Sequence, residues 1–494
     1  MILSPPVQSL ATRTVRGVFW TSSPFLLQFV TTFLFYGLLP TEQMGQFEGA
    51  LMIVMFLALL CDLGLGSALI QDRDTGDEHF AAAFWLCLAL GGVTTTAVVL
   101  LVSTVAELVS PEDADGFGPI LRGLVLLVPF AAVSGLFRAR LQRDLRWRAM
   151  AVAEIGSSVI HAGTALSLLA TGHGITSAVY SAVAREAALL LALAWTARWL
   201  PTPRFGFDAL RRILAFGLNL TGSRCLNYLN SNLARVVIGW SLGMEALGFY
   251  SFAYRLTLMP LVRISTIITR VFFPTFSAIS HDNDLLRRVY LRSVQAVALT
   301  YWPALAALAV LAEPVVLLAG PTMGPAVWPV RLLALATIIK AVGASVGSVF
   351  LAKGKASWAL YWSAFSLLVL IPALYWGGLF GIEGVCAVLA ATGALFLVLS
   401  QYLANRLMGI GFATYSAVLW RPALVALLTG AVTLTALPML PATPVMACVV
   451  GTAVAAVAGL AGLRWIAWND VRGMWHSARG SSADASAMSP LSKG

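Results

Sequence analysis

The sequence predicts an all-α polytopic membrane protein of about 14 transmembrane helices, arranged as two parallel six-helix lobes plus two C-terminal helices. Three observations predict this class. Hydrophobic residues make up 59% of the 494 residues and charged residues only 11%, whereas a soluble domain carries about 25% charge. Apolar stretches of about 20 residues, long enough to span a bilayer, recur along the whole chain. Lys and Arg are also concentrated in every second loop along the chain, as they are in the cytoplasmic loops of membrane proteins.

The apolar stretches define the expected helices in chain order. Those of the first lobe span residues 17–39, 47–70, 80–106, 117–137, 149–170 and 174–197. Those of the second lobe span residues 213–241, 246–278, 294–318, 329–352, 357–379 and 381–404. The last two span residues 415–436 and 443–466. The predicted domains are an N-lobe at 1–198, a C-lobe at 199–406, the helix pair within 407–466 and a disordered cytoplasmic tail at 467–494, which is polar and rich in Ser and Ala.

The distribution of Lys and Arg predicts the orientation in the membrane. With the N-terminus in the cytoplasm, 23 of the 32 cationic residues fall in cytoplasmic segments or at helix ends, and none falls in an outside loop. Both termini are therefore expected to be cytoplasmic. The formal charge of +10 does not indicate nucleic acid, because the basic segment 138–148 is explained as a cytoplasmic loop near anionic lipid.

A weak internal repeat supports the two-lobe prediction. The segment LPTEQMGQFEGA (39–50) is followed 203 residues later by LGMEALGFYSFA (242–253), and the two share Leu, Glu, Gly and Ala at matching positions. Six predicted helices separate the copies, so both copies run in the same direction through the membrane. Parallel repeats with a site between them are a transporter architecture.

Two neighbouring apolar segments, 213–241 and 246–278, carry more charge than a lipid-facing helix tolerates. They hold Arg224, Arg235, Arg255, Arg263 and Arg270. A guanidinium near the bilayer centre costs at least about 2.5–3.5 kcal/mol on insertion scales, so it normally faces a protein interior or a wet cavity. On ideal helices the arginines of each segment gather on one side. The pattern predicts a cationic cavity, and the alternative is that some of these arginines reach the membrane interface or satisfy carbonyl groups.

Three acidic residues also lie within predicted helices: Asp62, Glu154 and Glu186. A carboxyl group inside a membrane is a candidate carrier of a coupling ion. For the two glutamates we expect ion pairing with Arg185 across helices instead, and for Asp62 both roles stay open. Catalysis is not expected, because the loops are short, no Gly-rich phosphate loop precedes a Lys, and the five histidines lack metal-ligand spacing. No cofactor and no metal are predicted.

The segment CDLGLGSALIQDRD–EHFAAAFW (61–85) resembles the polysaccharide transporter (PST) family, the Wzx-like oligosaccharide flippases of the MOP superfamily, particularly the colanic-acid-exporter type. The segments LPTEQMGQFEGA, RARLQRDLRWRAM and RVFFPTFSAIS carry the same resemblance, as does the stretch from Phe216 to Pro260. The likeness runs from about Arg13 to Arg406. It implies a bacterial inner-membrane flippase that moves undecaprenyl-diphosphate-linked oligosaccharide to the outer leaflet by alternating access, coupled to H⁺ or Na⁺.

The resemblance assigns expected roles to the polar residues of the two charged segments. Arginine binds phosphate oxygens bidentately and stays charged. The expected diphosphate ligands are Arg224, Arg235, Arg255 and Arg263. Arg270 and Arg16 are expected where the substrate enters, with membrane anchoring as the alternative for Arg16. Asn227 and Tyr228 are expected sugar contacts, with helix–helix hydrogen bonding as the alternative.

Three other functions compete with this expectation. A related exporter would handle a peptidoglycan lipid precursor or cationic drugs, and an arginine-rich cavity disfavours the drugs because it repels cations. A membrane-embedded component of a glycan polymerase complex would need a large outside loop, and the chain shows none. Expected partners are the lipid-linked glycan, membrane lipids and the glycan polymerase and export machinery, with no nucleic acid.

Overall fold

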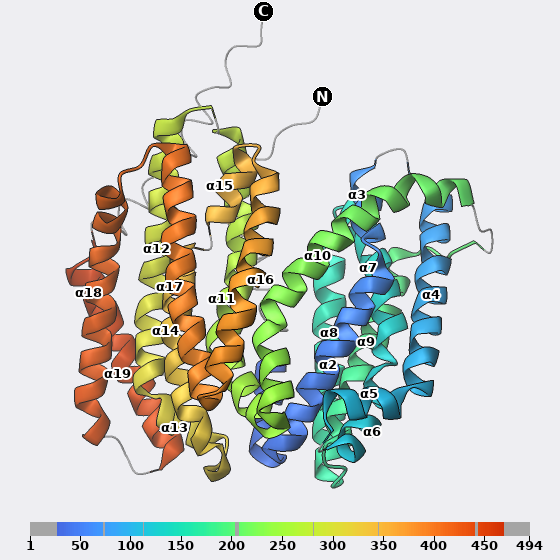
Figure 1. The fold of residues 1–494 in the computed structure, drawn as a ribbon, viewed down its shortest axis with the longest axis horizontal. Helices are drawn as coiled ribbons and strands as arrows, with labels where there is room; N and C mark the ends of the chain where they lie inside the picture. Colours follow the sequence, from blue (N-terminus) through green and yellow to red (C-terminus); the bar gives the residue numbers. More distant parts are fainter. Residues whose placement is uncertain are drawn as a thin grey trace, which may run out of the picture. The chain divides into compact units, whose positions relative to one another are not determined.

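The regular elements of this chain are helices throughout the described residues, which confirms the all-α class (Figure 1). The computed structural model describes residues 27–72, 75–111, 113–202, 207–279, 281–343, 345–439 and 443–468. Side chains are described only in part within 207–216, 262–278 and 356–360. The predicted tail therefore lies outside the described residues from position 469 onward.

Eleven helical segments in the described ranges are long and apolar enough to cross a membrane, as expected of a multi-pass membrane protein. The first predicted span is described as a shorter apolar helix, Leu27–Leu38. The two helices that carry the candidate arginines, α10 (Phe207–Ser241) and α11 (Gly243–Ala278), are not among the eleven. In α10 this follows from its polar side chains, since four arginines and four asparagines interrupt the apolar sequence. The total of 14 spans stays a prediction.

The described residues from 27 to 251, together with 363–382, form one compact unit, called the N-unit below. Its complete helices after Leu27–Leu38 are α2 (Thr41–Asp62), α3 (Leu65–Gln71), α4 (Asp77–Leu100), α5 (Val102–Val109), α6 (Ala114–Leu124), α7 (Leu127–Arg143), α8 (Trp147–Ala170), α9 (Thr176–Ala197) and α10. Helix α7 is central, because it packs against α2, α3, α4 and α9. Its buried Leu136 and Phe137 and the buried Phe117 and Leu121 of α6 contribute to the core.

The second unit, called the C-unit below, contains residues 252–362 and the described residues from 383 onward. Its helices include α12 (Asn283–Val310), α13 (Ala312–Leu318), α14 (Val327–Gly343), α15 (Val346–Ala352), α17 (Gly381–Met408), α18 (Phe412–Ala436) and α19 (Pro444–Trp465), with 3₁₀ turns at Pro321–Ala326 and Leu437–Met439. Helix α12 packs against α14, α18 and α19. Helices α11, α16 (Ala356–Gly378) and α17 each contribute residues to both units. The division into two six-helix halves and a terminal pair stays a prediction.

The two copies of the predicted repeat touch each other within the N-unit, at the starts of α2 and α11. A Cβ added to Gly45 would collide with the backbone carbonyl of Met244, and a Cβ added to Gly248 would collide with the carbonyl of Thr41. Gly45 corresponds to Gly248 and Thr41 to Met244 at the 203-residue offset. The contact is therefore reciprocal, as in a two-fold interface. Only glycine lets the two backbones approach this closely.

Helix α2 ends abruptly at Asp62, and this break positions the candidate site. Leu63 and Gly64 both adopt left-handed conformations, with φ of 47° and 64°. The chain then starts α3 at Leu65. A left-handed residue ends a helix, and glycine adopts this conformation without the steric cost that other residues incur. Because Asp62 is the last residue before the break, its carboxylate stands at the junction of the two helices.

Candidate substrate site

One face of α10 lies against the junction of α2 and α3 in the N-unit. Gly217, Thr221, Arg224 and Tyr228 follow one another at helical spacings of four, three and four residues, which places them within an arc of about 60°. At the top of this face, Gly217 meets the Leu63 carbonyl so closely that a Cβ would not fit. Figure 1 shows α10 running alongside α2 and α3. The backbone of α10 can touch the α2–α3 junction because Gly217 and Gly64 have no side chain at the contact.

Arg224 forms the centre of the site. Its Nη1 donates to Oδ2 of Asp62 at 3.0 Å, and its Nη2 donates to the hydroxyl of Ser67 at 2.7 Å. The Arg224 side chain is 36% exposed and that of Asp62 19%. A guanidinium has five N–H donors, so three have no partner among the described residues. An ion pair lowers the cost of placing an arginine within a membrane segment, and the unused donors leave it able to bind an anion.

The two expected sugar contacts have different surroundings. Asn227 is exposed, and its Oδ1 accepts a hydrogen bond of 3.3 Å from the hydroxyl of Ser363. Tyr228 is half-buried, and its hydroxyl donates to the backbone carbonyl of Met52 in α2 at 2.7 Å. Its ring lies 5.6 Å from that of Phe56. Asn227 is thus accessible to a ligand, whereas the hydroxyl of Tyr228 is used in a hydrogen bond between α10 and α2.

This geometry predicts a modest effect for Tyr228→Phe. The substitution keeps the ring contact and removes one hydrogen bond, so we expect a loss of about 1 kcal/mol of stability with transport retained. Thermal unfolding of the purified protein and a transport assay in cells measure the two quantities. A strong loss of transport without a change in unfolding temperature would instead favour the sugar-contact role.

The remaining predicted diphosphate ligands are described to different extents. Arg235 is half-buried, and its Nη1 donates to Oδ1 of Asn232 at 3.1 Å. The Asn232 amide in turn donates to the Tyr228 carbonyl at 2.9 Å. Arg255 is half-buried in the part of α11 that belongs to the C-unit. The side chains of Arg263 and Arg270, and the whole of Arg16, lie outside the described residues.

The three acidic candidates are all ion-paired. Asp62 pairs with Arg224, as described above. Glu154 of α8 lies 3.6 Å from Arg138 of α7, so pairing across helices occurs but with a different partner from the one predicted. Glu186 lies 3.4 Å from Arg185, its neighbour on the same helix. Arg185 also contacts the Gln28 amide. With this amide oriented so that its oxygen faces Arg185, the oxygen accepts hydrogen bonds from Arg185 Nε at 2.9 Å and from Arg185 Nη2 at 3.1 Å.

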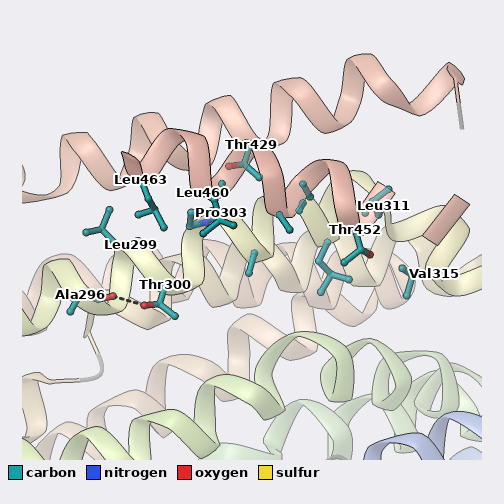
Figure 2. A pocket seen from close by; sticks show the side chains of 16 residues that line it. Ala296, Leu299, Thr300, Pro303, Leu311, Val315, Thr429, Thr452, Leu460 and Leu463 are labelled. Carbon is teal, nitrogen blue, oxygen red and sulfur yellow. Dashed lines mark hydrogen bonds between the residues drawn. The ribbon is translucent and has the colours of Figure 1, made fainter. Parts of the chain in front are cut away.

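The C-unit holds a separate apolar groove of about 920 Å³ between α12, α13, α18 and α19 (Figure 2). Leu299, Pro303 and Leu460 are among its lining side chains. The hydroxyls of Thr300 and Thr429 donate to carbonyls of their own helices, at 2.9 and 2.8 Å. Because these polar groups are satisfied internally, the groove presents hydrocarbon. Its chemistry matches a lipid chain rather than a headgroup.

Comparison with known proteins identifies the family. The model of the family described as "Polysaccharide biosynthesis protein" matches residues 37–320. This chain belongs to that family. The chain is 26% identical over 436 residues to the lipopolysaccharide biosynthesis protein WzxC of Escherichia coli (strain K12), covering 86% of this chain and 88% of WzxC. It is 25% identical to the teichuronic acid biosynthesis protein TuaB of Bacillus subtilis (strain 168), covering 86% and 89% of the two chains.

Solved structures share the fold of this chain. The lipid II flippase MurJ in an inward closed conformation matches with a TM-score of 0.74 at 12% identity, covering 91% of this chain and 99% of MurJ. An inward-facing multidrug resistance MATE transporter of the MOP superfamily matches with a TM-score of 0.64 at 16% identity, covering 78% and 94%. The family match and the curated relatives confirm the expected resemblance to a polysaccharide biosynthesis family, and the solved structures show the shared fold.

Sequence reasoning missed the partners of Arg224. Ser67 was not predicted, and Asp62 was considered only as an ion carrier or as one half of an unspecified pair. A signal was present, since a carboxylate and a guanidinium within apolar segments tend to pair with each other. The chain has several acidic residues and many arginines, however, and their separation in the sequence does not indicate which acid pairs with which arginine.

Proposed function

We propose that this protein is a flippase for polyprenyl-diphosphate-linked oligosaccharide in exopolysaccharide or O-antigen biosynthesis. It transfers the substrate from the cytoplasmic to the outer leaflet of the bacterial inner membrane by alternating access, and both of its termini are cytoplasmic. The observation that carries the proposal is Arg224, a partly exposed guanidinium of α10 with three donors that have no partner among the described residues.

The chemistry of the substrate explains why such a group is needed. A diphosphate bearing sugars does not cross hydrocarbon unaided, whereas its polyprenyl chain can stay in lipid. Fixed arginines replace part of the water that the diphosphate loses, because their N–H groups match phosphate oxygens. In this proposal Arg235, Arg255 and Arg263 are further diphosphate ligands, Asn227 contacts the sugar, and Arg16 and Arg270 act where the substrate enters.

The relatives support the glycan as the cargo class. WzxC and TuaB are described as proteins of lipopolysaccharide and teichuronic acid biosynthesis. The succinoglycan biosynthesis transport protein ExoT of Rhizobium meliloti (strain 1021) is 30% identical over 65% of this chain and 65% of its own length. We further propose H⁺ or Na⁺ as the coupling ion, with Asp62, Glu154 and Glu186 as candidate carriers, and the glycan polymerase and export machinery as partners.

The proposal is tested in cells that lack this protein. We expect complete, unpolymerised lipid-linked units to accumulate on the cytoplasmic side, measured by quantifying the units and assigning them to a leaflet with a membrane-impermeant probe. Wild-type protein restores their outward transfer. If the units reach the outer leaflet normally in a strain without a redundant flippase, the flippase proposal fails and a role in polymerisation takes its place.

A further inference from the structure

The carboxylate of Asp62 is confined by groups other than Arg224. The helix break at Leu63 and Gly64 leaves Asp62 as the last residue of α2. On the α7 side, a Cβ at Gly135 would lie 3.2 Å from Oδ1, so this glycine leaves room for the carboxylate. On the α4 side, the uncharged Cys87 contacts the Asp62 backbone carbonyl at 4.0 Å. Among the described residues, Asp62 is therefore a confined carboxylate whose ion-pair partner is Arg224.

The guanidinium is less restricted than its partner. Arg224 extends from α10 and is 36% exposed, while Asp62 is 19% exposed. It reaches Asp62 with one N–H and Ser67 with another, so it makes no bidentate pair with the carboxylate. Bidentate pairing with a carboxylate or phosphate is the stronger arrangement. A diphosphate thus has a geometric advantage over Asp62, and it also carries more charge.

We propose that Asp62 is a resident counterion of Arg224, which the substrate diphosphate displaces on binding and which competes for the guanidinium when the substrate leaves. This inference rests on the proposed diphosphate function of Arg224. Asp62 acts as a positioning residue: it keeps the guanidinium neutralised in the empty protein and weakens the hold on the diphosphate. Without it, an empty carrier exposes an uncompensated charge in a medium of low dielectric constant.

The test measures binding and transfer separately. Purified protein in nanodiscs is titrated with geranylgeranyl diphosphate, and outward transfer of lipid-linked glycan is measured in cells. Removing the competing carboxylate in Asp62→Asn is expected to lower the Kd for the probe about tenfold while slowing transfer. Adding a second carboxylate in Ser67→Asp is expected to raise the Kd about tenfold, which keeps the inference testable if Asp62→Asn does not fold.

Two controls separate competition from structural support. Asp77→Asn removes a carboxylate that pairs with Arg140 at 2.7 Å elsewhere in the N-unit, and it should leave the Kd unchanged. Arg224→Gln should abolish the response to both Asp62→Asn and Ser67→Asp. An unchanged or weaker affinity in folded Asp62→Asn overturns the counterion role, as does an unchanged Kd in Ser67→Asp. If the wild type does not bind the diphosphate at all, the proposed function of Arg224 fails as well.

Discussion

Replacing Arg224 with glutamine is expected to lower outward transfer of lipid-linked glycan by about 100-fold, the effect of losing a charged hydrogen-bonding partner in a partly buried site. The reason is that glutamine keeps much of the length and the polarity but supplies neither the charge nor the planar set of donors that suits a diphosphate. Arg224→Lys keeps the charge alone and should retain an intermediate rate. The measurement is the rate at which lipid-linked units become accessible to a membrane-impermeant probe.

The same substitution also leaves Asp62 without its partner, so the experiment needs a variant that separates folding from binding. In the double variant Asp62→Asn/Arg224→Gln the pair is replaced by two neutral amides, which relieves the unpaired charge. If Arg224 binds substrate, the double variant stays inactive. Recovery of transfer in the double variant would mean that the arginine serves only the ion pair. Arg331→Gln is a matched control, because Arg331 lies in the C-unit over the ring of Trp328, 5.2 Å from its centroid.

Replacing Gly45 with alanine is expected to destabilise the N-unit by about 2–3 kcal/mol, the upper part of the range for overpacking a close contact. The added methyl group would meet the Met244 carbonyl and lie 2.9 Å from the Gly248 backbone nitrogen, and neither atom belongs to a flexible side chain. The starts of α2 and α11 would have to separate. Gly248→Ala should act similarly, because the contact is reciprocal.

Thermal unfolding of purified protein in detergent measures this effect. Gly92 of α4 is the matched control, since an added Cβ there meets nothing within 4 Å. Alanine has a higher helix propensity than glycine, so Gly92→Ala should be neutral or stabilising by up to about 1 kcal/mol. Equal unfolding temperatures for Gly45→Ala and Gly92→Ala would show that the close contact between the repeat copies contributes nothing to stability.

Much of the architecture could be predicted from local sequence properties. Apolar length locates each span because a helix must cover the hydrocarbon thickness of the bilayer. The predicted segment 213–241 lies within α10 and 149–170 lies within α8, and 174–197 begins two residues before α9 and ends with it. The helix breaks were harder to locate. The segment 47–70 was predicted as one helix, but it divides at Leu63 and Gly64 into α2 and α3.

The candidate site was predicted only in part. The arginine-bearing face of α10 follows from helical periodicity, and Arg224 and Tyr228 do share a face. The expectation that Tyr228 contacts sugar arose from its position beside Arg224, whereas its hydroxyl reaches the Met52 carbonyl. Periodicity states which residues share a face but not which element covers that face. Which element covers a face depends on how closely two helices can approach. Here Gly64 and Gly217 allow α10 to approach the α2–α3 junction.

The sequence by itself determined that this is a multi-pass membrane protein of a polysaccharide biosynthesis family, with cations gathered on α10. These properties follow from composition, hydropathy and local motifs, which act over a few helical turns. Only the tertiary structure decided that Asp62 and Ser67 meet Arg224. The acid and the arginine are 162 positions apart in the chain, and their contact depends on the direction in which α2 ends. A side chain interacts strongly only over a few ångströms, so backbone packing chooses its partner.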